Sequence, residues 1–183
     1  CYFFRLHFNF KFYSMKKVVL FFSVMCFSFS FGQEMEEIKV TKKNSWFKAG
    51  IIAGVPVGDV KNFSSVNLGA DLRGQYMVTP HFAIGVASGY NHFFFYFDAE
   101  DFGIIPLALF GRYYFQEEGV FIGSDIGYGY LTNMDDAGGI YINPQIGYHN
   151  PDWNIYAFYQ NTFAENVNIR SVGLGATYNI RFK

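Results

Sequence analysis

The sequence predicts an all-β fold, an eight-stranded antiparallel up-and-down transmembrane β-barrel over residues 46–183. Three observations predict it. Apolar residues alternate with small or polar residues from Val172 to Phe182. Seven further strand-like segments precede this one, and their connections alternate between tight turns and longer loops. A period of two indicates a β-strand with one apolar face and one small or polar face.

The residues before the barrel divide into three parts. We interpret residues 1–14 as upstream sequence translated in error, with Met15 as the start. Residues 15–32 have the features of a secretory signal peptide, since two lysines precede an apolar run of about 14 residues that ends in small residues. That run is shorter than the ~20 residues of a transmembrane helix. Residues 33–45 are expected to form a polar periplasmic tail.

The composition after Gly32 excludes several classes of protein. Both cysteines precede Gln33, so the remaining chain has no disulfide, no cysteine-ligated metal and no cysteine nucleophile. Four of the fourteen basic residues also precede Gln33, whereas all fifteen acidic residues follow it, which leaves residues 33–183 with a formal net charge of −5. An acidic balance argues against binding to nucleic acid. The length of this segment is that of one domain.

Eight segments carry the strand pattern, and each is long enough to cross a bilayer when tilted. In chain order they are residues 46–56, 65–77, 82–93, 102–115, 120–131, 139–149, 153–161 and 168–182. The connections 78–81, 116–119 and 150–152 are rich in turn-forming Pro, Gly, Asn and Asp. The remaining connections are longer or more acidic: 57–64, 94–101, 132–138 and 162–167.

This alternation of connections is typical of barrels whose short turns face the periplasm. An even number of strands also places both ends of the barrel on that side.

The two faces of the segments differ in kind. One face is apolar, as in the series Leu107, Leu109, Gly111 and Tyr113, and the other carries the charged and many of the small residues. The charged residues that we assign to the second face are Lys48, Asp71, Arg73, Arg112, Asp125 and Arg181. Alternation alone does not state which face points outward, and a soluble lipocalin-like barrel would turn the apolar face inward.

Glycines and aromatic residues indicate that the apolar face points outward. Glycines crowd the charged face, which suits the narrow interior of an eight-stranded barrel, where small residues fit. Aromatic residues gather on the apolar face where strands meet the short turns, as in an interfacial girdle. This predicted girdle consists of Tyr76, Phe82, Tyr113, Phe115, Tyr148, Trp153, Tyr178 and Phe182.

The alternating, aromatic-terminated C-terminal strand resembles the closing strand of bacterial outer-membrane barrels. Over residues 46–183 the chain resembles the small outer-membrane β-barrels of the OmpA/OmpX architecture, in the outer membrane protein β-barrel domain family. The resemblance implies a monomer in the outer membrane, in contact with outer-membrane lipid and lipopolysaccharide. It also implies insertion by the outer-membrane assembly machinery, which would recognise the C-terminal strand. Activity does not follow from the fold.

The charges of the second face form the first candidate site. Lys48, Asp71, Arg73, Arg112 and Asp125 are expected to meet inside the barrel. Unpaired charges there would be costly, so we expect ion pairs. Such a network either fills the interior as a structural plug or gates a narrow pore. The plug is favoured, because side chains fill the interiors of eight-stranded barrels.

A second hypothesis is a lipid A-modifying enzyme. Three histidines follow Gln33, namely His81, His92 and His149. His92 approaches an acidic loop and shares a strand with Ser88, so the sequence offers a His/Ser/carboxylate set. Four residues of strand separate Ser88 from His92 by ~13 Å, which is beyond hydrogen-bond reach. We therefore expect no enzyme and no catalytic residue.

A third hypothesis places a ligand site on the loops of the outer rim. Its carboxylates are Asp98, Glu100, Asp101, Asp135 and Asp136. They could bridge divalent cations to lipopolysaccharide phosphates. The favoured alternative is that residues 93–97 complete an outer aromatic girdle and that these acids are solvated loop charges, since neither loop has the spacing of a calcium site. No metal site and no cofactor are expected.

The sequence thus predicts a non-enzymatic integral outer-membrane protein with a structural or surface-interaction role. The alternatives are a narrow gated pore, a loop-mediated ligand binder, a lipid A-modifying enzyme and a soluble periplasmic lipocalin-like binding barrel.

Overall fold

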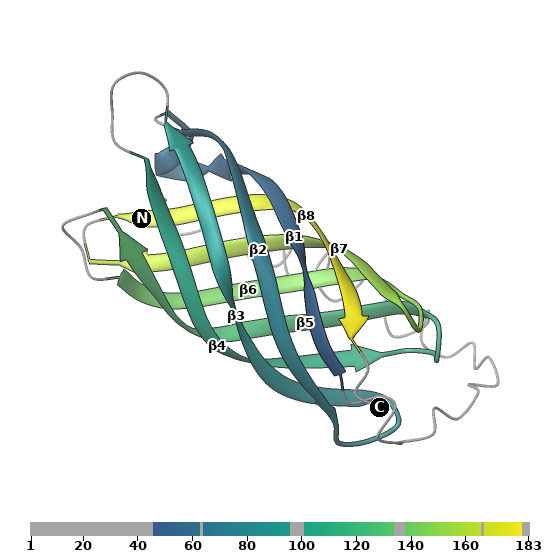
Figure 1. The fold of residues 1–183 in the computed structure, drawn as a ribbon. Helices are drawn as coiled ribbons and strands as arrows, with labels where there is room; N and C mark the ends of the chain where they lie inside the picture. The colour runs from purple at the N-terminus through teal and green to yellow at the C-terminus, as the bar shows by residue number, and fades with distance from the viewer. Residues whose placement is uncertain (1–45, 63, 96–100, 134–137, 166, 181–183) are drawn as a thin grey trace, which may run out of the picture. The chain divides into compact units, whose positions relative to one another are not determined.

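The computed structural model describes residues 46–62, 64–95, 101–133, 138–165 and 167–180. The predicted upstream extension, signal peptide and periplasmic tail lie outside these residues. The described strands close into one antiparallel barrel, in which each strand pairs with its neighbours in the chain and β8 pairs with β1 (Figure 1). This confirms the predicted eight-stranded up-and-down barrel.

The eight strands follow one another with short connections. Their bounds are β1 Trp46–Val57, β2 Ser64–Met77, β3 Phe82–Phe95, β4 Phe102–Tyr114, β5 Gly119–Thr132, β6 Gly138–His149, β7 Trp153–Ala164 and β8 Asn168–Ile180. A short 3₁₀ helix, η2 (Gly58–Asn62), follows β1. Within the described ranges, no helix has the length and apolar character needed to span a membrane.

The observed strands differ from the expected segments only near their ends. The largest difference is in β7, which continues to Ala164 because Asn161 and Thr162 still pair with Arg170 and Ile169 of β8. In β4 the strand ends at Tyr114, so Phe115 lies in the turn, although its N–H still donates to the carbonyl of Val120. Pairing to a neighbouring strand therefore sets each strand end.

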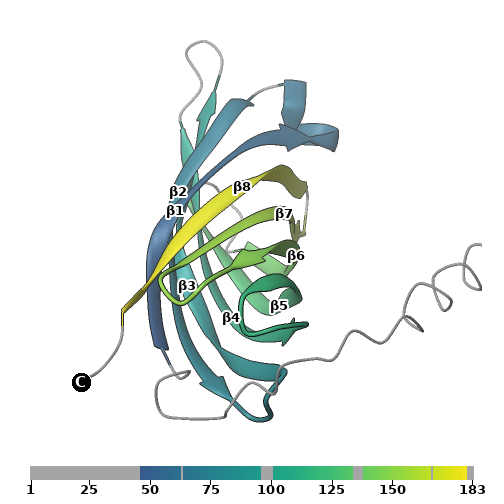
Figure 2. The same ribbon diagram turned by 90° about the vertical axis from the view of Figure 1, so that its right-hand side faces the viewer.

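The two ends of the barrel have different connections. At one end β1 and β8 begin and finish side by side, since Phe47 pairs with Ile180. Tight turns close this end, and polar side chains fix their backbones. Thr79 Oγ1 accepts hydrogen bonds from the N–H groups of His81 and Phe82, and Asn150 Oδ1 accepts them from Asp152 and Trp153. The other connections leave the opposite end (Figures 1 and 2), and the one between β7 and β8 is not the longer link predicted over 162–167, since only residues 165–167 separate the two strands.

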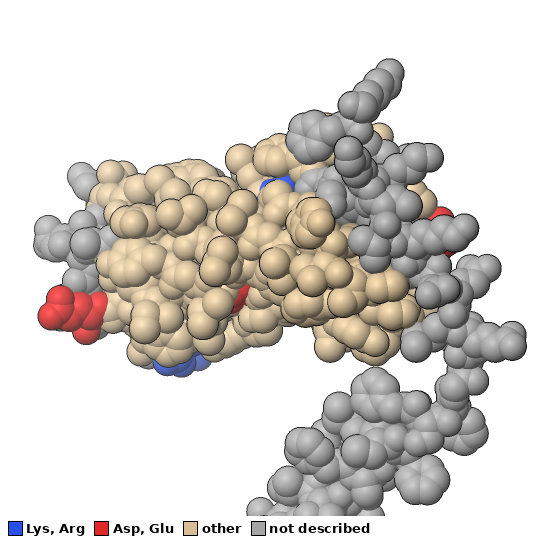
Figure 3. Space-filling model, turned by 90° about the horizontal axis from the view of Figure 1, so that it is seen from below, with Lys and Arg blue, Asp and Glu red and all other residues tan. Residues whose placement is uncertain are grey.

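The apolar face of the wall points outward. Ile51, Leu109, Ile126 and Leu174 are all more than 60% exposed, whereas their inward neighbours are buried or partly buried. In a space-filling view the wall shows mostly uncharged residues, with only small areas of acidic or basic side chains (Figure 3). A lipocalin-like barrel would have this face inside, so the lipocalin-like alternative does not describe this wall.

Candidate functional site

The centre of the barrel interior holds an ion-pair network. The guanidinium of Arg73 donates to both carboxylate oxygens of Asp125, at 2.7 and 2.9 Å, and its Nε donates to Asp71 at 2.8 Å. The three side chains come from β2 and β5 and are almost completely buried. Two parallel N–H···O bonds make the Arg73–Asp125 contact the strong, bidentate kind of charge pair.

Polar neighbours donate further hydrogen bonds to both carboxylates. Asn143 and Gln145 of β6 each donate to Asp125 at 2.9 Å, and the hydroxyl of Tyr156 donates to Asp71. A buried ion pair is tolerated only when such additional hydrogen bonds compensate for lost hydration. The network therefore joins β2, β5, β6 and β7 across the interior.

Arg112 extends this network through an amide. Its Nη2 donates to Gln145 Oε1 at 2.8 Å, and Gln145 in turn binds Asp125. The guanidinium lies over the ring of Phe121, 4.6 Å from the ring centroid, in a cation–π contact. Arg112 is 1% exposed and makes no ion pair with a described carboxylate.

Lys48 occupies a separate polar cluster nearer the short turns. Its Nζ donates to Asn154 Oδ1 at 2.9 Å and to the hydroxyl of Tyr114 at 3.2 Å. That hydroxyl donates to Gln75 Oε1 at 2.6 Å. The structure thus brings Asp71, Arg73 and Asp125 together by ion pairs, links Arg112 through Gln145 and gives Lys48 polar partners of its own. All five residues predicted for the interior lie there.

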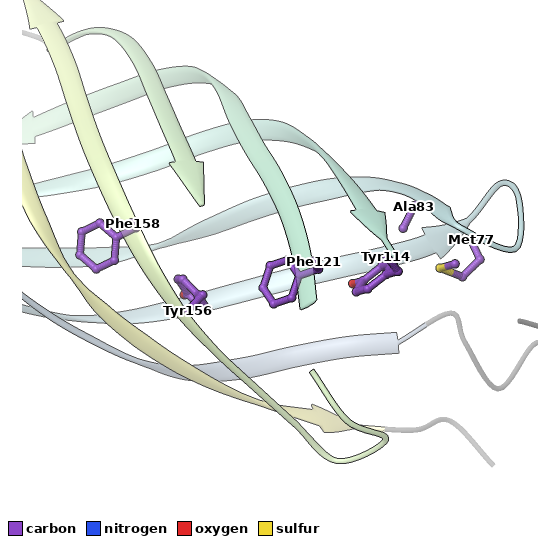
Figure 4. Close-up of a cluster of buried hydrophobic side chains, with 6 residues drawn as sticks. All are labelled: Met77, Ala83, Tyr114, Phe121, Tyr156 and Phe158. Atoms are coloured by element: carbon purple, nitrogen blue, oxygen red, sulfur yellow. The ribbon is translucent and has the colours of Figure 1, made fainter. Parts of the chain in front are cut away.

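Aromatic side chains fill the space between these polar groups. Met77, Ala83, Tyr114, Phe121, Tyr156 and Phe158 form one buried cluster, which is spread along the barrel axis (Figure 4). Glycines of the same inward face make room for the rings. A Cβ added at Gly175 would overlap the ring of Tyr156, and one at Gly85 would overlap Phe110. This is the reason that glycines share a face with the charges.

A second apolar layer lies at the end with the long connections. It consists of Val60 from η2 with Phe93, Phe102, Ile104 and Ile169, and it is called the outer apolar layer below. The rings of Phe93 and Phe102 stack at 4.7 Å between centroids. Polar amides separate this layer from the ion pairs, since Asn91 bonds to Asn67 and Gln160 at 3.0 Å each.

The aromatic girdle predicted near the short turns is on the outside of the wall. Its exposed members are Tyr76, Phe82, Tyr113, Tyr148, Trp153 and Tyr178. Phe115 is partly buried in the turn after β4, and Phe182 lies outside the described residues. Trp153 and Tyr178 contact each other edge to face across β7 and β8, with centroids 5.0 Å apart.

A second set of exposed aromatics lies towards the other end, where the sequence predicted that residues 93–97 complete an outer girdle. Phe94 is exposed there, whereas Phe93 is buried in the interior and residues 96 and 97 lie outside the described residues. The members of this set, called the outer girdle below, are Tyr90, Phe94, Tyr128, Tyr130, Tyr159 and Phe163. Exposed aliphatic residues such as Ile126 and Leu174 lie between the two girdles. The strand parity that located the first girdle could have found the other members, because each occupies an outward position near a long connection.

His92 lies on the outer face within the outer girdle and has two polar partners. Tyr90 Oη lies 3.0 Å from its Nδ1, and Asp101 Oδ2 lies 3.2 Å from its Nε2. Asp101 also accepts the N–H of Phe95 at 2.9 Å, and this hydrogen bond is the main cause of the lowered pKa of its carboxyl. No hydrogen bond joins His92 to Ser88, which occupies an outward position on the same strand.

The other two histidines bind backbone groups. His81 Nδ1 lies 2.9 Å from the carbonyl of Tyr114, and His149 Nε2 lies 3.0 Å from that of Gln116. Both contacts lie at the short turns. Of the five predicted loop carboxylates, only Asp101 is described; the others, Asp98, Glu100, Asp135 and Asp136, lie outside the described residues, as does Arg181. Within the part of the chain that the structure describes, no three His, Cys, Asp or Glu side chains are grouped to hold a metal ion.

Arg170 is a charged strand residue that the sequence assignment of faces left out. It shares the parity of Val172 and Leu174, so it occupies an outward position on β8, opposite Asn161 of β7. The same alternation that defines the apolar face would have placed it there. Its position is an exception to the expectation that strand charges point inward.

No protein-family model and no curated protein matches the chain. Its fold is similar to that of Ail, the attachment invasion locus protein of Yersinia pestis, with a TM-score of 0.54 and 16% identity over 74% of this chain and 97% of that chain. It is also similar to neisserial surface protein A, with a TM-score of 0.50 and 16% identity over 75% and 97%. Both are small eight-stranded outer-membrane barrels, and the present chain has the fold of that group.

Proposed function

We propose that the chain is a non-enzymatic, integral outer-membrane protein with a structural or surface-interaction role. The observation that carries the proposal is the outer surface of the wall. Exposed aliphatic side chains lie between two sets of exposed aromatic residues. Contact of such a large apolar surface with water is unfavourable. A bilayer suits it, because hydrocarbon covers the aliphatic zone while Tyr and Trp side chains lie at headgroup depth.

The filled interior supports a structural role over catalysis or transport. Ion pairs, buried rings and the outer apolar layer occupy successive levels of the barrel. His92 and Asp101 form the one described pair of imidazole and carboxylate. The second ring nitrogen of His92 forms a hydrogen bond with Tyr90, and no described serine forms a hydrogen bond with either member of the pair. In this proposal the protein is a monomer, contacts lipid and lipopolysaccharide, and enters the membrane through the barrel assembly machinery by its C-terminal strand.

The test is gel mobility of protein expressed from Met15, recovered in washed outer membranes and run with and without boiling. A closed sheet has no free edge, so the folded barrel should resist SDS until heated. A heat-dependent shift in the membrane fraction is the expected result. Soluble protein with a single mobility would contradict the proposal.

A narrow pore is the second candidate, and the charge balance of the interior predicts its ion selectivity. The described strands place three cationic side chains inside, namely Lys48, Arg73 and Arg112, against the two carboxylates of Asp71 and Asp125. An interior with excess positive charge would favour anions if it opened. Single-channel recording in planar bilayers, with potassium chloride as the electrolyte, tests this candidate.

A further inference from the structure

The outer face carries two polar positions at the depth of the outer girdle, and they differ in how they are satisfied. His92 lies between Tyr90 and Phe94 of β3 and has partners for both ring nitrogens. Asn161 lies between Tyr159 and Phe163 of β7 and faces Arg170 across the β7–β8 ladder. The protein supplies hydrogen-bond partners for both ring nitrogens of His92, whereas polar atoms of Asn161 and Arg170 have none.

The unsatisfied position has one donor and one acceptor without partners. Arg170 Nε and Asn161 Oδ1 are both buried, and neither forms a hydrogen bond. Asn161 as a whole is only 5% exposed. Among the side chains that the structure describes, no carboxylate forms an ion pair with Arg170, and Arg170 as a whole is partly exposed. Buried polar atoms without partners need an explanation, and a bound group outside the protein is one that suits an outward position.

The local backbone holds the guanidinium in place. Gly58, at the start of η2, has a φ of +71°, a conformation that favours glycine. A Cβ at this residue would lie 3.3 Å from Nη1 of Arg170 and 3.5 Å from its Cδ. Arg170 therefore packs against Gly58, with Val57 of β1 as its register partner on the other side. β1, η2, β7 and β8 together form the site.

From this geometry we infer that Arg170 binds the phosphate of an outer-leaflet lipid headgroup. The inference rests on the proposed function, because it needs the outer girdle to lie at headgroup depth. A guanidinium binds phosphate through paired N–H donors. Asn161, buried opposite Arg170 in the β7–β8 ladder, would position the guanidinium. The level of Arg170, between aromatic side chains at the membrane interface, suits a lipid phosphate better than one free in solution.

The test measures retention of lipid A by the full barrel in phosphatidylcholine nanodiscs that contain a small fraction of lipid A. After transfer to detergent, native mass spectrometry counts the lipid A molecules that remain bound. Arg170→Gln should weaken retention about tenfold, because it removes a charge-assisted contact. Arg170→Lys should restore part of it, since lysine keeps the charge but loses the paired donors. Asn161→Leu should have a smaller effect of the same sign.

Lys61→Gln is the matched control, because it removes the same charge from an exposed residue of the neighbouring η2. Retention by this variant should equal that of the wild type. Equal retention by Arg170→Gln and the wild type, or equal losses in Arg170→Gln and Lys61→Gln, would overturn the site. Displacement of lipid A by millimolar inorganic phosphate would overturn its assignment to a lipid. Heat-dependent gel mobility of each variant reports the proposed function separately, so a folded barrel without selective retention refutes the site alone.

Discussion

The centre of the barrel interior and its outer apolar layer fill the same narrow space with opposite chemistry. At the centre, Arg73 binds two carboxylates, amides bind Asp125 and the hydroxyl of Tyr156 binds Asp71, so these charges depend on particular partners. In the outer apolar layer, Phe93, Phe102 and their neighbours contact one another without directional bonds. The comparison teaches that the centre tolerates substitution of a partner poorly, whereas the outer layer depends mainly on volume.

The largest expected effect is that of Arg73→Met. This change leaves Asp71 and Asp125 buried without their cation, which typically costs about 3–5 kcal/mol. The free energy of unfolding should fall by that amount in urea titrations of the barrel in lipid vesicles, followed by tryptophan fluorescence. Lys61→Met is the control and should change the free energy by less than about 0.5 kcal/mol. A loss below about 1 kcal/mol for Arg73→Met would contradict the importance of the ion pairs.

Phe93→Ala should have the next largest effect. Loss of a stacked, fully buried ring costs about 3 kcal/mol or more in a packed core. The same urea titration measures it, and Phe93→Leu should recover most of the loss because it restores apolar volume. If Phe93→Leu is as destabilising as Phe93→Ala, the outer apolar layer depends on ring stacking and not on volume.

Conductance measurements test whether the central ion pairs or the outer apolar layer close the interior. Arg73→Ala and Phe93→Ala should each leave planar-bilayer conductance equal to that of the wild type. In each variant the other group of side chains, the outer apolar layer or the central ion pairs, still fills the interior. The double variant should conduct above the wild-type level. A rise in the Arg73→Ala variant alone would instead assign the closure to the charges and favour the gated pore.

The smallest effect concerns Asp101 at the outer rim. Hydrogen bonding to Phe95 holds the pKa of its carboxyl below the ordinary value, so the ionised form is favoured in the folded state. The order that Asp101 gives to the end of β3 is then present above about pH 4 and is lost as the pH falls through the lowered pKa. The amide resonance of Phe95 in NMR spectra should titrate below pH 4, and Asp101→Asn should abolish this titration. A midpoint above pH 4 would contradict the assignment.

The strands, their parity and the character of each face followed from the sequence alone. A strict period of two over segments such as 120–131 leaves no alternative to a strand, and glycine beside Asp125 indicated which face is the crowded interior. The inward positions of Lys48, Asp71, Arg73, Arg112 and Asp125 followed from the same parity. The same parity also gives the outward position of Arg170 and the members of the outer girdle beyond residues 93–97, such as Tyr128 and Tyr159.

Only the tertiary structure decided which side chains meet. Arg73 binds Asp125 of β5 as well as Asp71 of its own strand. The contact with Asp125 depends on strand tilt and on closure of β8 against β1, because these bring β2 and β5 opposite each other across the interior. The contact of Val60 with Phe93 depends on the path of η2 over the end of the barrel. Parity along one strand is a local property of the chain, whereas contacts across the interior depend on the registers of all eight pairs of strands together.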